Sequence, residues 1–400
     1  MHTKRKSARK TGYLRLPALI LSLLVGALLL AGRAAGAALF SAGLLMPQSV
    51  VLALREADIL PDAPAEPSGG GTDLSAERET RGNAAAQEDA AQTSTVPPGT
   101  KVQTTGSGKA AGTGIPADIQ ALMAQAQAAS KGQKPLGKIL EKDYARAGVT
   151  HSFQNVRLKS TSKTQSPNLE KLLAQKPELA IRDRKKPAVL IFHTHTTESY
   201  QQLTRGYYTA ADASRSDKAG ENMIRVGEAL AKALEQAGWQ VIHDKTVHDR
   251  SYTGAYDRSR ETVKRQLAAH PEIQVVLDVH RDAMHQSGGG KIKPTAIING
   301  KKAAQIMLIT GVQEGAVKNF PNWEKNLRFA LQFQRAMESV CPSLTRPILF
   351  SPRLYTMNLH PNNVLVEVGS DVNTLDEAVY AAGLAGSALA AMLAQYAKQE

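Results

Sequence analysis

Short apolar runs alternate with amphipathic helical patterns between residues 187 and 279, and this alternation constrains the fold more than any other feature of the sequence. The run at 187–192 is continuous and apolar, which is typical of a strand buried on both faces of a parallel sheet. Residues 222–237 place apolar side chains three and four positions apart, and Gly238 follows as a helix stop signal. Two more strands and a helix complete the alternation, at 239–242, 273–279 and 259–270. The pattern predicts a wound α/β sheet flanked by helices.

The sequence beyond residue 290 adds strands that make this sheet mixed. Apolar segments at 295–298 and 304–312 flank Asn299 and Gly300, a dipeptide that favours a tight hairpin turn. Two helices and a last strand are predicted further on, at 323–340, 375–397 and 364–368. Because a hairpin joins antiparallel strands, we expect the sheet to be mixed at one edge.

The N-terminal segment predicts membrane association. Six of the 49 Lys and Arg residues precede the first apolar run and define a basic cytoplasmic tail over residues 1–15. Residues 16–46 are apolar except for Arg33, and they predict a transmembrane anchor if that side chain reaches the far interface. A secretory signal, with small residues at 34–37 that suit a peptidase, is the alternative. Both alternatives place the rest of the chain outside the cytoplasm.

The composition then changes, and residues 47–135 predict a flexible linker. They are rich in Gly, Pro, Ala, Gln, Ser and Thr, so they bury too little apolar surface to offset their ordering entropy. A weak helical pattern at 119–129 interrupts the linker. Residues 136–186 form a pre-domain segment, and residues 187–400 form the folded domain.

Charge and cysteine content exclude several kinds of site. The formal net charge is +13, from 49 Lys and Arg against 36 Asp and Glu, and part of that excess lies in the basic tail. A basic helix face with interleaved aromatics is missing from the sequence, so we expect no nucleic-acid partner. Cys341 is the single cysteine, which excludes a zinc or iron–sulfur site held by cysteines of this chain. A bound metal would use histidines and carboxylates.

Polar residues stand at the ends of three predicted strands. His193, His195 and Glu198 follow the first strand, His280 ends the third, and Glu367 lies near the end of the last. Ligands collect at the carboxyl ends of strands in open α/β sheets, so we expect these residues to converge. Two imidazoles and a carboxylate are a common ligand set of catalytic zinc, and a further carboxylate is then available as a general base.

Structural roles are the alternative for each residue taken alone. His-x-x-Glu occurs often by chance, His280 could cap a strand, and Glu367 could pair with Arg281 or Arg353. Polar residues at three apolar strand ends are costly, however, unless they satisfy one another or a metal. Two other pairs are expected in turns or on the surface, His243-Asp244 and His248-Asp249.

Four segments of the chain together resemble the stage II sporulation protein P family. They are HTHTTESY at 193–200, DVHRDA at 278–283, PNWEKNL at 321–327 and LVEVGSDVNTLDEA at 365–378. The resemblance runs in order over about residues 187–396. The sequence departs from the family pattern at Ser370, Asn362 and Asn363, and none of these is a proposed ligand.

The resemblance implies a membrane-anchored peptidoglycan hydrolase with N-acetylmuramoyl-L-alanine amidase activity and a further endopeptidase activity. Proteins of that family thin the sporulation septum and act in engulfment, in the forespore intermembrane space. Sporulation protein D and a membrane protein of the same engulfment complex are the implied partners, besides peptidoglycan. The family is also similar in fold to zinc-dependent cell-wall amidases, which implies an amidase-like domain over residues 187–400 and a Zn²⁺ cofactor.

Matching the family residue by residue implies a metal site. His195 and His280 match the two amidase histidines. For the carboxylate, the run that contains Glu198 is the most recognisable feature of the family. The amidases place theirs at the start of the following helix, which selects Glu221 or Asp217 here. We favour Glu198, because an acidic residue at a helix start is already stabilised by the helix dipole.

The same matching implies roles for three further residues. Glu367 is expected to act as the general base, which takes a proton from water and returns it to the leaving L-alanine nitrogen. His193 is expected to be a substitute ligand or to hydrogen-bond substrate. Arg281 is expected to hold the oxyanion or a stem-peptide carboxylate, with a structural ion pair as its alternative.

Three other functions fit the same sequence. A non-catalytic wall-binding scaffold would keep the fold, and it predicts that function survives the loss of Glu367. A zinc carboxypeptidase acting on stem peptides would share the site and differ only in the bond that it cuts. A polyanion binder, suggested by the net charge, predicts binding with a steep salt dependence.

Overall fold

The computed structural model describes residues 114–286 and 289–397, all of which lie in one compact unit. The predicted basic tail, the anchor at 16–46 and the linker up to residue 113 lie outside the described residues. Within the described part, one helix, α8 (Leu375–Ala394), is long and apolar enough to cross a membrane, and 67% of its most apolar stretch is buried inside the protein.

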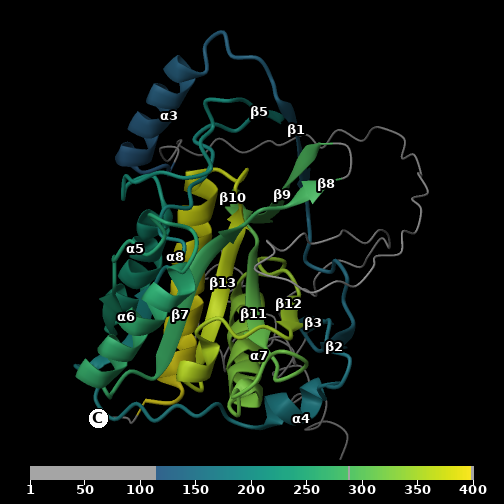
Figure 1. Cartoon of the computed structure of the whole chain (residues 1–400), viewed down its shortest axis with the longest axis vertical. Helices are drawn as coiled ribbons and strands as arrows, with labels where there is room; N and C mark the ends of the chain where they lie inside the picture. The colour runs from purple at the N-terminus through teal and green to yellow at the C-terminus, as the bar shows by residue number, and fades with distance from the viewer. Residues whose placement is uncertain (1–113, 287–288, 398–400) are drawn as a thin grey trace, which may run out of the picture. The chain divides into compact units, whose positions relative to one another are not determined.

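A mixed sheet of eight strands forms the centre of the fold, in the order β2-β3-β12-β11-β13-β7-β4-β6 (Figure 1). Its strands are β2 (His151–Phe153), β3 (Val156–Ser160), β4 (Pro187–Phe192), β6 (Gln240–His243), β7 (Val275–Asp282), β11 (Ile306–Gly311), β12 (Ile348–Ser351) and β13 (Asn363–Ser370). Strands β13, β7, β4 and β6 are parallel neighbours, whereas β11 is antiparallel to β13 and parallel to β12. The direction therefore reverses inside the sheet, between β11 and β13, and also at one edge, where β2 is antiparallel to β3.

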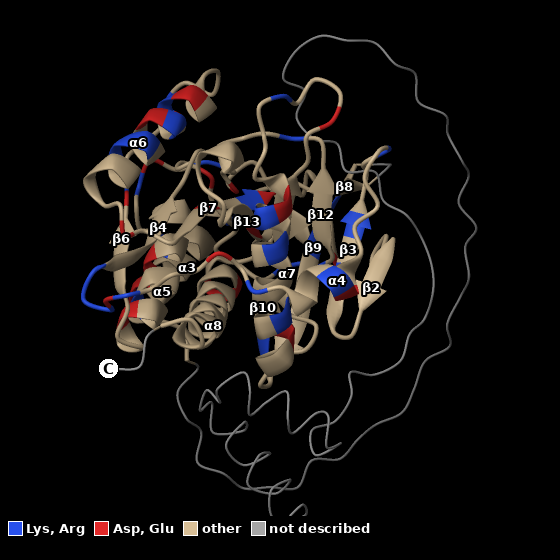
Figure 2. Ribbon diagram, turned by 90° about the horizontal axis from the view of Figure 1, so that it is seen from below, with Lys and Arg blue, Asp and Glu red and all other residues tan. Residues whose placement is uncertain are grey.

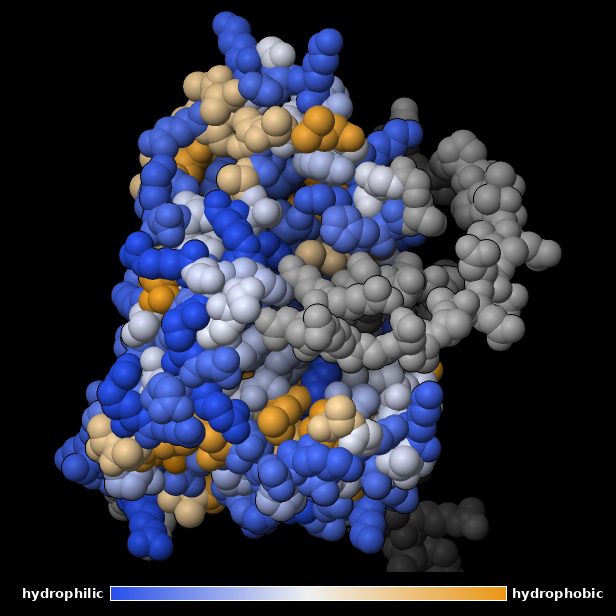
Figure 3. All heavy atoms as spheres, viewed as in Figure 1, coloured by the Kyte–Doolittle hydropathy of each residue, from blue (hydrophilic) through white to orange (hydrophobic). Residues whose placement is uncertain are grey.

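Helices cover the two faces of this sheet unequally. The described helices are α3 (Ala117–Ala129), α4 (Leu169–Ala174), α5 (Met223–Gln236), α6 (Ala255–Ala269), α7 (Trp323–Val340), α8 and the short 3-10 helix η1 (Met357–Leu359). Helix α8 packs against α5 and α7, and it carries few charged residues, whereas α6 carries many (Figure 2). Hydrophilic residues predominate on the face shown in Figure 3, with hydrophobic residues in scattered groups.

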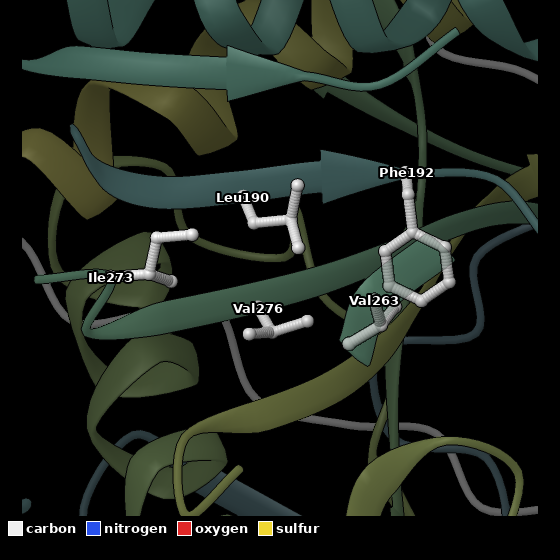
Figure 4. Packing of buried hydrophobic residues seen from close by; sticks show 5 residues of the cluster. All are labelled: Leu190, Phe192, Val263, Ile273 and Val276. Carbon is white, nitrogen blue, oxygen red and sulfur yellow. The ribbon is translucent and has the colours of Figure 1, made fainter. Parts of the chain in front are cut away.

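Helix α6 packs on the opposite face, over β4 and β7. Its Val263 contacts Leu190 and Phe192 of β4 and Val276 of β7 in a fully buried cluster (Figure 4). Burying one such aliphatic or aromatic side chain stabilises the fold by about 1.5–3 kcal/mol. This cluster fixes the strand ends that carry the polar residues.

A second, smaller sheet has the order β10-β9-β1-β5, with β8 paired to β9. Its strands are β1 (Gly137–Lys142), β5 (Tyr207–Tyr208), β8 (His285–Gln286), β9 (Gly290–Ile298) and β10 (Lys301–Ala304). Asn299 and Gly300 join β9 to β10 with φ angles of 50° and 75°, as a tight hairpin turn requires. The predicted hairpin is thus confirmed, but its second arm is β10, while β11 belongs to the main sheet.

The predicted boundary at residue 187 does not separate two folded parts. Strand β3 pairs with β12 in the main sheet, and β1 pairs with β9 in the smaller one, so the segment 136–186 is part of the fold. The weak pattern at 119–129 corresponds to α3. Helix α6 begins at Ala255 instead of residue 259, because its first turn lacks the apolar spacing that marks the rest of it.

Candidate active site

Parallel pairing brings three polar strand ends together. Strands β4 and β13 both flank β7, and the register pairs Phe192 with Asp278 and Glu367 with His280. A cavity of about 430 Å³ opens beside them, and four predicted residues line it: His195, Glu198, His280 and Glu367. Two imidazoles and two carboxylates from distant parts of the chain therefore face one space.

His280 of β7 contacts two carboxylates. Its Nε2 lies 2.8 Å from Oδ1 of Asp278, an ion-pair contact without regular hydrogen-bond geometry, and its Nδ1 lies 3.5 Å from Oε2 of Glu198. Asp278 is itself fixed, because the backbone N and Oγ1 of Thr194 both donate to it. Burial opposes a charged imidazole, but the two carboxylates prevail and hold the pKa of His280 well above its usual value. A carboxylate behind a histidine is also the usual support of a metal-ligating ring.

Glu198 is held in place by Arg281. The backbone N of Arg281 donates to Oε2 of Glu198 at 3.3 Å, and the guanidinium Nη1 lies 3.6 Å from Oε1. Other guanidinium nitrogens donate to the carbonyls of Ser199 and Ser214. Burial raises the pKa of Glu198, but the positive charges of Arg281 and His280 outweigh it and lower the value to about 2. Arg281 thus uses its donors to fix Glu198 and the loop around it.

His195 lies among aromatic rings. It stacks on Tyr252 with ring centroids 4.8 Å apart, and it meets Tyr256 and His280 edge to face at 5.5 and 5.3 Å. Its Nδ1 is buried without a hydrogen-bond partner among the described residues, and the carboxylate of Asp249 is 4.0 Å away. Burial and the charge of His280 lower the pKa of His195. The ring is therefore neutral near pH 7, which is the form that binds metals.

Glu367 is the second carboxylate at the cavity. Its side chain is partly accessible, yet its Oε2 is buried and has no hydrogen-bond partner in the described part of the chain. Burial and the charge of Asp282 raise the pKa of Glu367 to about 8, against the opposing effect of His280. A carboxyl group with a pKa near the working pH suits both proton acceptance and proton donation.

The residues at the cavity are of the types that bind zinc, although their side chains are not arranged as a complete coordination shell. Over residues 114–286 and 289–397, no three His, Cys, Asp or Glu side chains are placed to hold an ion directly. Three buried atoms at the cavity nevertheless lack hydrogen-bond partners among these residues, His195 Nδ1, His280 Nε2 and Glu367 Oε2. An unsatisfied buried polar atom needs an explanation, and a missing ion is a common one. Two imidazoles and a carboxylate are donors that zinc prefers.

His193 lies apart from this group, on the other face of the sheet. Its Nδ1 is 2.8 Å from the carbonyl O of Val279, and its Nε2 is 2.8 Å from Nε2 of His243. Successive residues of a strand point to opposite faces, so Phe192 packs under α6 while His193 turns toward α5. The structure does not bring His193 to the cavity, and its contacts are those of a buried structural residue.

Gly227 of α5 lies directly against this histidine pair. A Cβ at Gly227 would come within 2.5 Å of His243 Nε2 and 2.7 Å of His193 Nε2. Because overpacking a buried site costs about 1–3 kcal/mol, Gly227→Ala should lower the free energy of unfolding by about that amount. Denaturant unfolding measures the change. Gly220→Ala is the control, since nothing lies within 4 Å of its added Cβ, and equal stabilities would contradict this packing.

The alternative carboxylate ligands also lie away from the cavity. Oε2 of Glu221 accepts from Oγ of Ser216 at 2.8 Å, and its Oε1 pairs with Nζ of Lys218 at 3.0 Å. Asp217 is exposed, and neither acid lines the cavity. Of the candidate carboxylates, Glu198 is the one that contacts His280.

Sequence reasoning missed the residues that support the loop after β4. Asp249 accepts from the backbone N and Oγ1 of Thr197, at 3.1 and 2.7 Å, and His248 Nδ1 lies 2.8 Å from the carbonyl O of His193. His248 and Asp249 lie in a loop, which agrees with the prediction of turn or surface residues, but both are buried and not on the surface. No periodic pattern marks them, because they lie in a loop between β6 and α6. Tyr256, in the first turn of α6, was missed for the same reason.

Solved structures with low similarity to this chain include cell-wall amidases. The N-acetylmuramoyl-L-alanine amidase AmiC2 of Nostoc punctiforme aligns with a TM-score of 0.31 and 12% identity, over 52% of this chain and 96% of that one. The CwlD amidase from Clostridioides difficile, in complex with the GerS lipoprotein, has the same TM-score and identity over 52% and 98%. A metallo-carboxypeptidase from Burkholderia cenocepacia has a TM-score of 0.31 and 9% identity over 55% and 60%.

Sequence comparison identifies the family. Stage II sporulation protein P of Bacillus subtilis (strain 168) is 32% identical over 241 residues, which is 57% of this chain and 55% of that protein. The match therefore spans about half the length of this curated relative. The model of the family described as stage II sporulation protein P (SpoIIP) matches residues 114–393, which is nearly all of the described fold. The chain belongs to the SpoIIP family.

Proposed function

We propose that this protein is a zinc-dependent peptidoglycan hydrolase that cleaves the amide between N-acetylmuramic acid and L-alanine. The observation that carries the proposal is the cavity at which His195, Glu198, His280 and Glu367 meet in a SpoIIP-family chain. A scaffold without catalysis gives no reason for unpartnered buried atoms on His195 and Glu367.

His195, Glu198 and His280 are the residues that would hold the zinc. When bound, zinc polarises the scissile carbonyl and lowers the pKa of water at the site. Asp278 orients the ring of His280, and Arg281 orients Glu198, so two of the three proposed ligands are positioned by a buried neighbour. In this proposal Arg281 contributes by holding Glu198 in place, and His193 contributes by packing against α5.

Glu367 would move the proton. Its carboxylate form accepts a proton from the attacking water, and its acid form donates one to the nitrogen of the leaving L-alanine. Its pKa of about 8 places both forms within reach near neutral pH. Glu367 lies beside His280 in the sheet, so its carboxyl proton would be close to the amide that is cleaved.

Family membership supports a cellular setting for this activity. We infer a single-pass anchor at residues 16–46, with the hydrolase domain outside the cytoplasm at the sporulation septum. We infer that it thins septal peptidoglycan during engulfment, together with sporulation protein D and a membrane protein of the same complex. Endopeptidase activity on peptide cross-links belongs to the same proposal.

Product analysis with purified cell wall tests the function. We expect the full-length protein, purified in detergent, to release stem peptides with a free L-alanine amino terminus and to create no new reducing sugar ends. A chelator should abolish release, and added Zn²⁺ should restore it, because the proposed activity needs the metal. Mass spectrometry of the products measures both. Release of single C-terminal residues would favour a carboxypeptidase, and no release at all would favour a scaffold.

A further inference from the structure

The cavity continues from the reacting end along an apolar floor. Met307 and Ile309 of β11, Leu349 of β12 and Leu365 of β13 form one cluster on this face. The register pairs Met307 with Glu367, and Ile309 with both Leu365 and Leu349. The middle of the floor is thus two residues along the strand from Glu367, which corresponds to roughly 7 Å.

Arg353 lines the same cavity, and its carbonyl O lies against Gly311, four residues along β11 from the Met307 that pairs with Glu367. It follows β12, and its Nη1 donates to the phenol oxygen of Tyr355 at 2.8 Å. Among the described residues Arg353 has no ion pair. Two other arginines near the cavity do have one, since Arg281 pairs with Glu198 and Arg346 pairs with Asp282. Arg353 is therefore a cation that lines the cavity without a carboxylate partner within the described fold.

The chain holds Arg353 in place through close contacts. A Cβ at Gly311 would lie 2.1 Å from the carbonyl O of Arg353, so only glycine lets this loop approach β11. Tyr355 has a φ of 45°, in the left-handed region that costs a bulky residue free energy. Its ring stacks on Tyr256 at 4.9 Å, and Arg260 Nη1 donates to its carbonyl O at 3.2 Å. Several contacts thus fix a strained residue beside the guanidinium.

We propose that Arg353 binds a carboxylate of the peptide stem, a short distance beyond the amide that is cleaved. The inference rests on the proposed function and names the part of the substrate that the far end of the cavity recognises. A peptide residue spans about 3.3–3.6 Å, so two residues beyond the amide reach the middle of the apolar floor. The backbone of Arg353 lies against Gly311, two residues further along β11, and its long side chain bridges the remaining distance back toward the floor. The stem of peptidoglycan is acidic, and its second residue, D-glutamate, carries a free carboxylate at this spacing. A guanidinium recognises such a group by charge-assisted hydrogen bonds.

Two matched substrates test this assignment. One is N-acetylmuramoyl-L-alanyl-D-glutamate, and the other is the same compound with both glutamate carboxylates converted to carboxamides. We expect Arg353→Gln to lower kcat/KM for the acidic substrate about 10- to 100-fold, mainly through KM, and to change it little for the diamide. Arg353→Lys should restore part of the loss. Arg182→Gln removes an exposed charge outside the cavity and should leave both substrates unaffected.

Binding measured without turnover separates this inference from the proposed function. Both compounds are titrated by calorimetry into the wild-type protein and into Arg353→Gln, each with Glu367→Gln added. Tighter binding of the acidic compound that disappears with Arg353→Gln supports the assignment, even if no bond is cut. Equal losses for the two compounds, or no preference in the wild type, would overturn it.

Discussion

Glu367→Gln should reduce hydrolysis of the muramoyl amide by a factor of about 10²–10⁴, with the fold intact. The substitution keeps the size of the side chain and removes the carboxyl proton that the proposed reaction moves. Muropeptide release by mass spectrometry measures the loss, and circular dichroism establishes folding. Normal release by this variant would show that Glu367 does not move the proton.

The same variant should be more stable than the wild type at alkaline pH, in protein treated with chelator. The pKa of Glu367 is raised to about 8 in the folded state, so the folded protein keeps a proton that the unfolded chain loses above about pH 4.5. The wild type therefore loses stability as pH rises from 4.5 to 8, by about 1.4 kcal/mol per unit of pKa difference. Glutamine has no such proton. A stability gain over the wild type that does not grow with pH in this window would contradict the raised pKa.

Glu198→Gln should lose both bound zinc and activity, whereas Glu221→Gln should keep both. Removing even a supporting carboxylate of a metal site costs 10- to 100-fold in metal affinity, so loss of a ligand should exceed about 100-fold. Glu221 is the matched control, because it is an acid of the same size that hydrogen-bonds Ser216 away from the cavity. Metal content by mass spectrometry and a competition titration with a zinc-binding dye give the affinities. The reverse result would move the carboxylate ligand to Glu221.

The sequence predicted those parts of the fold that have strong periodicity. Strand β4 and helix α7 match their predicted bounds, because apolar runs and stop signals fix both ends. The predicted second arm of the hairpin was wrong. Ala303 and Ala304 of β10 look continuous in sequence with the apolar residues of β11, although β10 and β11 belong to different sheets. Strands β1 and β3 were missed as part of the fold, because their partners β9 and β12 are distant in sequence.

The meeting of the polar strand ends could be predicted from the strand order. The residues that hold these side chains in place could not. Strand order alone places His280 beside Glu367, and the general rule for open sheets anticipates it. Asp278 and Asp249 reach the site from a strand interior and a loop, so no spacing relates them to His195. His193 illustrates the opposite error: two residues of a continuous strand at this spacing would share a face, but β4 ends at Phe192 and the chain turns at 194–197, so His193 and His195 reach different faces.

Three of the four residues of the apolar floor belong to β11 and β12 and one, Leu365, to β13, whereas the proposed reacting groups come from β7, β13 and the loop after β4. In the proposed function, recognition of the peptide stem and cleavage of the amide would therefore depend largely on different strands, which meet where β11 pairs with β13. Substitutions at Ile309 or Leu349 can change which chemical type of peptidoglycan is accepted without altering the residues proposed for proton transfer. Members of the family that face differently amidated walls should accordingly diverge first along these two strands.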